Sequence, residues 1–155
     1  MSPLEITALA LDPARILMAQ GLAPDPWQRD LLLSPERCLL LNCSRQAGKS
    51  TTVAALALHR ALFHARSLVL LVAPAERQSH ELFRKALACY GALGRPIPAL
   101  RSNASELELA NGSRIVALPG KEGTIRSFSG YIPKVGGRGS GWSVASNRTT
   151  QRQKC

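Results

Sequence analysis

The sequence lacks the cysteine patterns that hold metals or staple small secreted domains. Its four cysteines, Cys38, Cys43, Cys89 and Cys155, include no CxxC pair, and no histidines lie among them at metal-ligand spacing. The pattern therefore predicts neither a zinc site nor a disulfide framework. We interpret these cysteines as buried or free thiols.

Long apolar runs are also absent. No stretch approaches the roughly 20 apolar residues that a membrane-spanning helix needs, and no cationic start is followed by an apolar signal segment. We therefore expect no membrane partner and a cytosolic protein. A chain of 155 residues is long enough for one domain with a hydrophobic core, and two full domains are not expected.

Acidic residues are missing from the C-terminal part of the chain. The formal net charge is +10, and the residues after Glu122 hold six Lys or Arg and no Asp or Glu. Such an excess is compatible with binding to the phosphates of a nucleic acid. A solvated, disordered segment is the other interpretation, since the stretch lacks interleaved aromatic residues and apolar periodicity.

What the sequence does contain is a phosphate-loop pattern. An apolar run from Cys38 to Leu41 is followed by a small polar loop that ends in Gly48-Lys49-Ser50-Thr51. The pattern needs a strand, then GxxxxGK[ST], then a helix, because backbone N–H groups and a helix N-terminus cradle a phosphate chain. Glycine lets the backbone approach the nucleotide, lysine reaches the terminal phosphates, and serine offers its hydroxyl to Mg²⁺. Cys43 stands where the first glycine is expected.

The flanking segments predict an α/β fold. We expect Cys38–Leu41 to be a strand buried on both faces, 50–65 to be a helix and 67–74 to be a second buried strand, which together make a parallel βαβ crossover. An amphipathic helix should follow within 75–94, and then a hairpin around Asn111-Gly112. We interpret the segment 120–130 as a polar loop or as a strand-edge loop near phosphate or DNA. His59, Arg60 and His64 should face solvent.

Two short helices are predicted before the loop. Asp12-Pro13 and Asp25-Pro26 each combine a capping residue with a proline suited to the first helical position. The second helix allows two interpretations. In one, Trp27 is a core anchor and Gln28 is a surface residue. In the other, Gln28 binds the adenine edge, because an amide both donates and accepts hydrogen bonds.

The acid that ATP hydrolysis needs is missing. A phosphate-loop ATPase holds Mg²⁺ with the loop Ser or Thr and with an acidic residue at the end of another buried strand, and a carboxylate activates the attacking water. No apolar strand in this sequence ends in Asp or Asp-Glu. We therefore expect nucleotide binding with little or no turnover.

Four stretches, in this order, resemble the large subunit of phage terminases, the motor ATPases that package DNA into capsids. They are DPWQRDLL, CSRQAGKST, LLVAPAERQSHELFRKA and NGSRIVALPGKEGTIRSFSG. The second resembles the variant phosphate loop of that family, which lacks the first glycine and keeps Ser-Arg-Gln before GK[ST]. The likeness extends from about Pro24 to Gly130.

The resemblance implies a P-loop NTPase-like α/β domain with a mostly parallel sheet and helices on both faces. It implies that Gln28 contacts adenine, that Arg45 faces the γ-phosphate and acts in catalysis with Lys49, and that Ser50 binds Mg²⁺. The implied ATP-binding set is Gln28, Cys43, Ser44, Arg45, Gln46, Ala47, Gly48, Lys49, Ser50 and Thr51. The implied partners are double-stranded DNA, the terminase small subunit and the portal, in the cytoplasm of a bacterial host that carries the phage or prophage.

The likeness ends where the family continues with an apolar strand ending in Asp-Glu and, later, a nuclease domain. Here a basic, glycine-rich segment runs from Tyr131 to Cys155 instead, and we place no helix or strand in it. Our hypothesis is a truncated or frame-shifted gene product, with an incomplete ATPase domain over residues 1–130 and no nuclease domain. Its tail at 131–155 is disordered or translated out of the ancestral frame. Two alternatives remain: a helicase-like ATPase fragment and a non-catalytic basic fragment that binds nucleic acid or another subunit.

Overall fold

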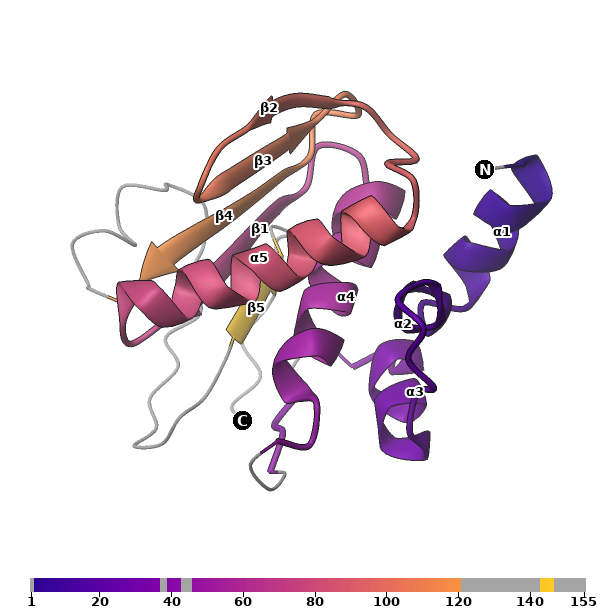
Figure 1. The fold of residues 1–155 in the computed structure, drawn as a ribbon, viewed down its shortest axis with the longest axis horizontal. Coiled ribbons are helices and arrows are strands. Elements are labelled where there is room, and N and C mark those ends of the chain that lie inside the picture. The colour runs from indigo at the N-terminus through magenta and orange to yellow at the C-terminus, as the bar shows by residue number, and fades with distance from the viewer. Residues whose placement is uncertain (1, 37–38, 43–45, 121–142, 147–155) are drawn as a thin grey trace.

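The computed structural model describes residues 2–36, 39–42, 46–120 and the backbone of 143–146, which form an α/β fold (Figure 1). In chain order the elements are α1 (Pro3–Leu11), α2 (Arg15–Ala19), α3 (Pro26–Leu33), α4 (Lys49–Phe63), β1 (Leu68–Ala73), α5 (Glu76–Ala92), β2 (Ala99–Ser102), β3 (Glu106–Leu109), β4 (Arg114–Pro119) and β5 (Ser143–Ser146). Helices α4 and α5, strand β1 and the hairpin of β3 and β4 confirm the predicted elements in this part of the chain.

The strands form one mixed sheet in the order β2-β3-β4-β1-β5. Among the described strands, only β1 and β4 pair in parallel, with Val69 opposite Ile115 and Leu71 opposite Ala117. The other pairs, β1 with β5, β2 with β3 and β3 with β4, are antiparallel. The prediction of a mostly parallel sheet was therefore wrong, because the chain between α5 and β4 folds back as a hairpin instead of crossing over the sheet again.

The predicted strand at Cys38–Leu41 does not form in its described part. Residues 39–42 are not in a strand, Leu40 is 96% exposed, and only Leu41 packs against the core. Both edges of β1 are already paired, one with β4 and the other with β5. The apolar run therefore has no free edge of β1 to pair with, and the predicted βαβ crossover through α4 is absent from the described residues.

One face of the sheet carries the main core. Val69, Leu71, Ile115 and Ala117 point to this face, and α4 and α5 pack against it together with part of the N-terminal helices. Phe83 of α5 is fully buried there. The opposite face has a smaller cluster that consists of strand residues in the described part of the chain: Leu68, Leu70, Val72, Val116 and Leu118. The described helices thus lie on one face, which corrects the prediction that helices cover both.

The N-terminal helices differ from the sequence prediction in two ways. Helix α2 begins at Arg15 with Ala14 as its N-cap, so the prediction of Asp12 as the cap and Pro13 as the first residue was wrong. Helix α1 was not predicted; Ser2 caps it, and the side chain of Glu5 accepts a hydrogen bond from the Ser2 backbone N–H. Asp12 ends α1, and its carboxylate accepts a hydrogen bond from Ala14 N–H just before α2. The predicted start of the next helix is confirmed, because Asp25 is the N-cap of α3 and Pro26 is its first residue.

Strand β5 lies in the basic segment to which the sequence assigned no element. Its backbone pairs with Val69–Val72 of β1. The predicted loop at 120–130 lies outside the described residues except for Gly120, whose N–H donates to Ala73 O at 2.7 Å. Within the described part of the chain, every helix is too short or too polar to cross a bilayer.

Candidate functional site

The phosphate-loop pattern lies at the start of α4, as the sequence predicts. Gly48 is the N-cap with a left-handed backbone (φ 78°), and the helix begins at Lys49. The N–H groups of Thr51 and Thr52 both donate to Gly48 O at 3.1 Å, which closes the first turn. Ala47, Lys49 and Ser50 are half-buried. The first turn of α4 therefore combines the positive end of a helix dipole with a lysine.

The structure places part of the predicted nucleotide-binding set. Gln46 is exposed and has a positive φ of 64°, which is uncommon for a residue other than glycine. Cys43, Ser44 and Arg45 lie outside the described residues. The backbone thus takes the left-handed conformation at two nearby positions, Gln46 and Gly48, and the chain turns sharply into α4.

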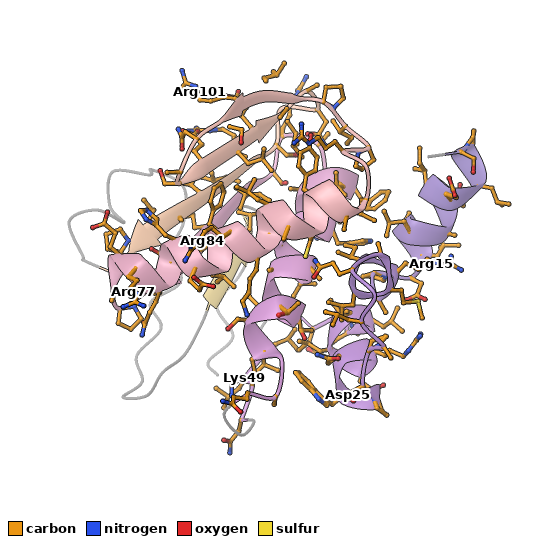
Figure 2. The ribbon with its side chains drawn as sticks, in the orientation of Figure 1. Arg15, Asp25, Lys49, Arg77, Arg84 and Arg101 are labelled. Carbon is orange, nitrogen blue, oxygen red and sulfur yellow. The ribbon has the colours of Figure 1, made fainter. Side chains whose placement is uncertain are left out.

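Gln28 lies beside the loop, but both polar atoms of its amide form hydrogen bonds within the protein. Asp25 N–H donates to its Oε1 at 2.8 Å, and its Nε2 donates to Thr52 Oγ1 at 2.8 Å. Gln28 is 8% exposed, whereas Trp27 is only half-buried. The interpretation of Trp27 as the core anchor and Gln28 as a surface residue was therefore wrong. In Figure 2, Lys49 and Asp25, which mark the starts of α4 and α3, lie at the same end of the molecule.

Two further residues at this site were not singled out by the sequence. Thr52 is fully buried, and its hydroxyl donates to Gly48 O at 3.1 Å. Lys85, from the middle of α5, places its ammonium 3.4 Å from Thr51 Oγ1. The only signal for Thr52 is its position after GKST. Lys85 is 36 residues away from Lys49 in the sequence, and no sequence spacing connects the two.

The charges around the first turn of α4 favour an anion. The turn contains no acidic residue, and Lys49 and Lys85 bring two cations to the positive end of the helix dipole. Within the described residues, neither β1 nor β4 ends in an acid, since their last residues are Ala73 and Pro119. The arrangement can neutralise a phosphate group, and the described residues supply no carboxylate at a strand end to hold a metal opposite Ser50.

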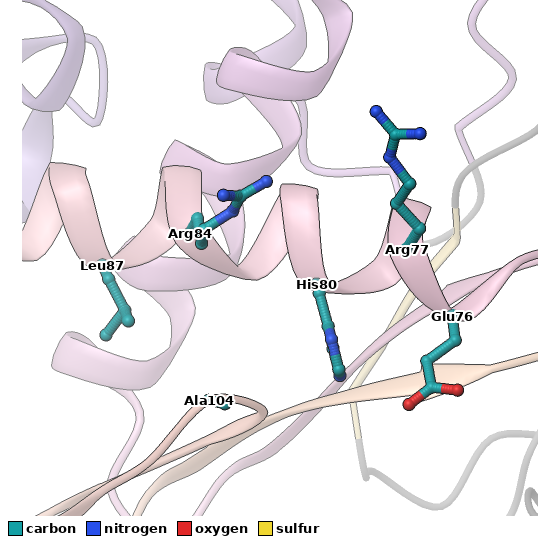
Figure 3. A pocket seen from close by; sticks show the side chains of 6 residues that line it. All are labelled: Glu76, Arg77, His80, Arg84, Leu87 and Ala104. Carbon is teal, nitrogen blue, oxygen red and sulfur yellow. The ribbon is translucent and has the colours of Figure 1, made fainter.

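A shallow groove of about 580 Å³ lies elsewhere, on the side of α5 that faces the turn between β2 and β3 (Figure 3). In Figure 3, Glu76, His80 and Leu87 extend from the side of α5 on which Ala104 lies, while Arg77 and Arg84 extend from the other side. Its six lining residues come from α5 and this turn, and none from α4. Because it combines one acid with three basic side chains and little enclosure, we assign it no chemistry.

In the described part of the chain, burial shifts the pKa values of His59 and Cys89. Burial lowers the pKa of His59, whose Nε2 contacts Leu9 O at 3.2 Å and Ala10 O at 3.3 Å. Burial raises the pKa of the Cys89 thiol to about 11, so it is not a nucleophile at neutral pH. His59, Arg60 and His64 are all half-buried, which corrects the prediction that they face solvent.

A comparison of the chain with models of known protein families and with curated proteins finds no match.

Proposed function

We propose that this chain binds MgATP at the loop before α4 and is an ATP-binding fragment related to the large subunit of phage terminases. The observation that carries the proposal is the start of α4: Gly48 is left-handed, and the helix begins at Lys49. In the proposed complex, backbone N–H groups at the start of α4 bind phosphate oxygens, Lys49 neutralises the terminal phosphates, and the Ser50 hydroxyl is a Mg²⁺ ligand. Magnesium would supply charge neutralisation between the phosphates.

Arg45 would face the γ-phosphate in this proposal, by resemblance to the SRQAGKS loop. Double-stranded DNA, a small subunit and a portal are the partners that the same resemblance proposes for the complete family protein. The sequence departs from the family after Gly130, where the basic segment begins. Reading the downstream nucleotides in the other two frames tests this origin, and the hypothesis fails if neither frame encodes an apolar strand that ends in Asp-Glu.

The proposed activity is binding with little or no hydrolysis. Hydrolysis needs a carboxylate that orients the attacking water. In the described structure, Glu106 and Glu108 lie on the antiparallel strand β3, and Asp25 caps α3. No described strand that runs parallel to another ends in an acid. The described residues therefore supply the proposed phosphate-binding groups without a strand-end carboxylate that could activate water.

The decisive experiment measures MgATP binding and turnover separately on the full chain. We expect binding by isothermal titration calorimetry and no sustained phosphate release. Lys49→Ala should abolish binding, and Arg101→Ala is the control, because Arg101 lies on the exposed edge strand β2. If Lys49→Ala binds MgATP with the same affinity as the unchanged chain, the proposed site at the start of α4 is rejected. Sustained turnover that depends on Lys49 would reject the claim that the missing acid prevents hydrolysis.

A second candidate is supported by the charge alone. The net charge of +10 and the acid-free segment after Glu122 favour a nucleic-acid-binding fragment without catalysis. DNA binding that weakens steeply with salt, is lost on removal of residues 131–155 and is unaffected by ATP would support it. Nucleotide binding that depends on Lys49 but not on that segment would support the first proposal.

A further inference from the structure

A chain of hydrogen bonds connects the start of α3 to the glycine of the loop. Asp25 N–H donates to Gln28 Oε1 at 2.8 Å, Gln28 Nε2 donates to Thr52 Oγ1 at 2.8 Å, and the Thr52 hydroxyl donates to Gly48 O at 3.1 Å. The orientation of the amide follows from its partners, because only the oxygen can accept from the Asp25 N–H. Both functional atoms of Gln28 are therefore used within the protein.

Gln28 also touches the loop directly. A Cβ atom added at Gly48 would lie 2.8 Å from Gln28 Nε2, which means that the amide packs against the bare Cα of the glycine. Gln28 is 8% exposed and Thr52 is fully buried. Little of the Gln28 amide is therefore accessible to a base that approaches from solvent. To read adenine, Gln28 would have to give up partners that hold the first turn of α4.

We propose that Gln28 is a positioning residue for the phosphate loop and not the residue that reads the base. The inference rests on the proposed function, since it concerns the same nucleotide site. Through Thr52, Gln28 holds the Gly48 carbonyl and thereby orients the backbone where Lys49 and Ser50 begin the helix. If Gln28 only positions the loop, the site binds nucleoside triphosphates through their phosphate chain. Gln28 then contributes no preference for adenine over other bases.

The two roles predict different ligand dependence. A base reader contributes only to ligands that carry its base, so its removal weakens ATP and leaves GTP and tripolyphosphate unchanged. A positioning residue acts on the phosphate-binding backbone, so its removal weakens all three ligands by the same factor. The pattern across ligands therefore separates the roles, whatever the absolute affinity.

The test measures binding of MgATP, MgGTP and Mg-tripolyphosphate to the full chain, Gln28→Ala, Thr52→Val and the double variant. We expect each single variant to bind all three ligands about five- to tenfold more weakly, the size of effect expected when one buried hydrogen bond is lost. The double variant should bind no more weakly than either single variant, because both remove the same contact. Thr52→Ser keeps the hydroxyl and should bind like the unchanged chain.

Thermal unfolding of each variant accompanies the titrations and shows whether it is folded. Thr52→Val removes the hydroxyl and keeps the shape of the side chain, so it changes the packing less than an alanine would. A loss confined to MgATP in Gln28→Ala would overturn the inference in favour of base reading. Unchanged binding of all ligands by both single variants would overturn it in favour of a purely structural contact. If the unchanged chain binds none of the ligands, the proposed function fails and the inference fails with it.

Discussion

The ammonium of Lys85 lies 3.4 Å from the hydroxyl of Thr51, so a residue from the middle of α5 reaches the first turn of α4. No acidic residue occupies that turn, and the described carboxylate nearest to Lys85 in sequence, Glu81, pairs with Arg84. A half-buried cation held at the positive end of a helix is unfavourable unless an anion shares the site. We therefore expect Lys85 to be a second cation at the proposed phosphate site, beside Lys49.

Replacing Lys85 should weaken phosphate binding without unfolding the protein. Lys85→Ala is expected to bind MgATP about fivefold more weakly, which corresponds to roughly 1 kcal/mol for one lost charge-assisted contact. Calorimetric titration measures the change. Arg84→Ala is the matched control, because Arg84 is the neighbouring cation but is exposed and paired with Glu81. Equal affinities for Lys85→Ala and the unchanged chain would show that the ammonium takes no part.

Gly48 should not tolerate a side chain. Gly48→Ala places a Cβ in a left-handed backbone and 2.8 Å from Gln28 Nε2, so it adds backbone strain and forces the buried, hydrogen-bonded amide to shift. Gly21→Ala isolates the strain, since Gly21 has nearly the same φ and no atom within 4 Å of an added Cβ. The strain alone costs about 1–2 kcal/mol. Urea unfolding should show a larger loss for Gly48→Ala than for Gly21→Ala, and equal losses would contradict the close contact.

The turn between β3 and β4 caps the far end of α4. Asn111 Nδ2 donates to Ala61 O at 2.8 Å and to Leu62 O at 3.2 Å, while Ser113 Oγ donates to His64 O at 2.8 Å. Removing the amide leaves carbonyls at the helix end without their donor.

Asn111→Ala should therefore lower the free energy of unfolding by about 1–3 kcal/mol. Chemical denaturation measures this change. Asn103→Ala is the comparison, because the Asn103 side chain accepts hydrogen bonds from the nearby Ser105 and Glu106 in an exposed turn and caps no helix. A smaller loss for Asn111→Ala than for Asn103→Ala would contradict the capping role.

His59 predicts a dependence of stability on pH. Burial lowers its pKa below the ordinary value of 6.5, against the effect of its two carbonyl partners in α1. The folded state therefore favours the neutral ring. Its contribution to stability is present above pH 6.5 and is lost as the pH falls through the lower folded pKa.

The difference in melting temperature between pH 7.5 and pH 5 should be smaller in His59→Gln than in the unchanged chain. Glutamine can still donate to Leu9 O and Ala10 O but does not titrate. His64 and Arg60, which also lower the pKa of His59, are left in place in this variant. An identical pH response in both proteins would show that other groups control it.

Local patterns in the sequence determined several elements by themselves. Apolar periodicity defined α4 and α5, the run of residues 67–74 defined β1, and Asn111-Gly112 placed the hairpin of β3 and β4. The glycine and lysine of the loop marked the start of α4 correctly. These features depend on residues within about one helical turn or one strand, so no knowledge of distant contacts was needed.

Only the tertiary structure decided which strands pair and which side chains meet. Residues 38–41 read as a buried strand, yet the structure pairs both edges of β1 with other segments, and strand pairing is a long-range choice that periodicity does not specify. Gln28 and Lys85 meet Thr52 and Thr51 across 24 and 34 residues of sequence. The sequence located the loop before α4, and only the tertiary structure shows that α3 and α5 contact its first helical turn.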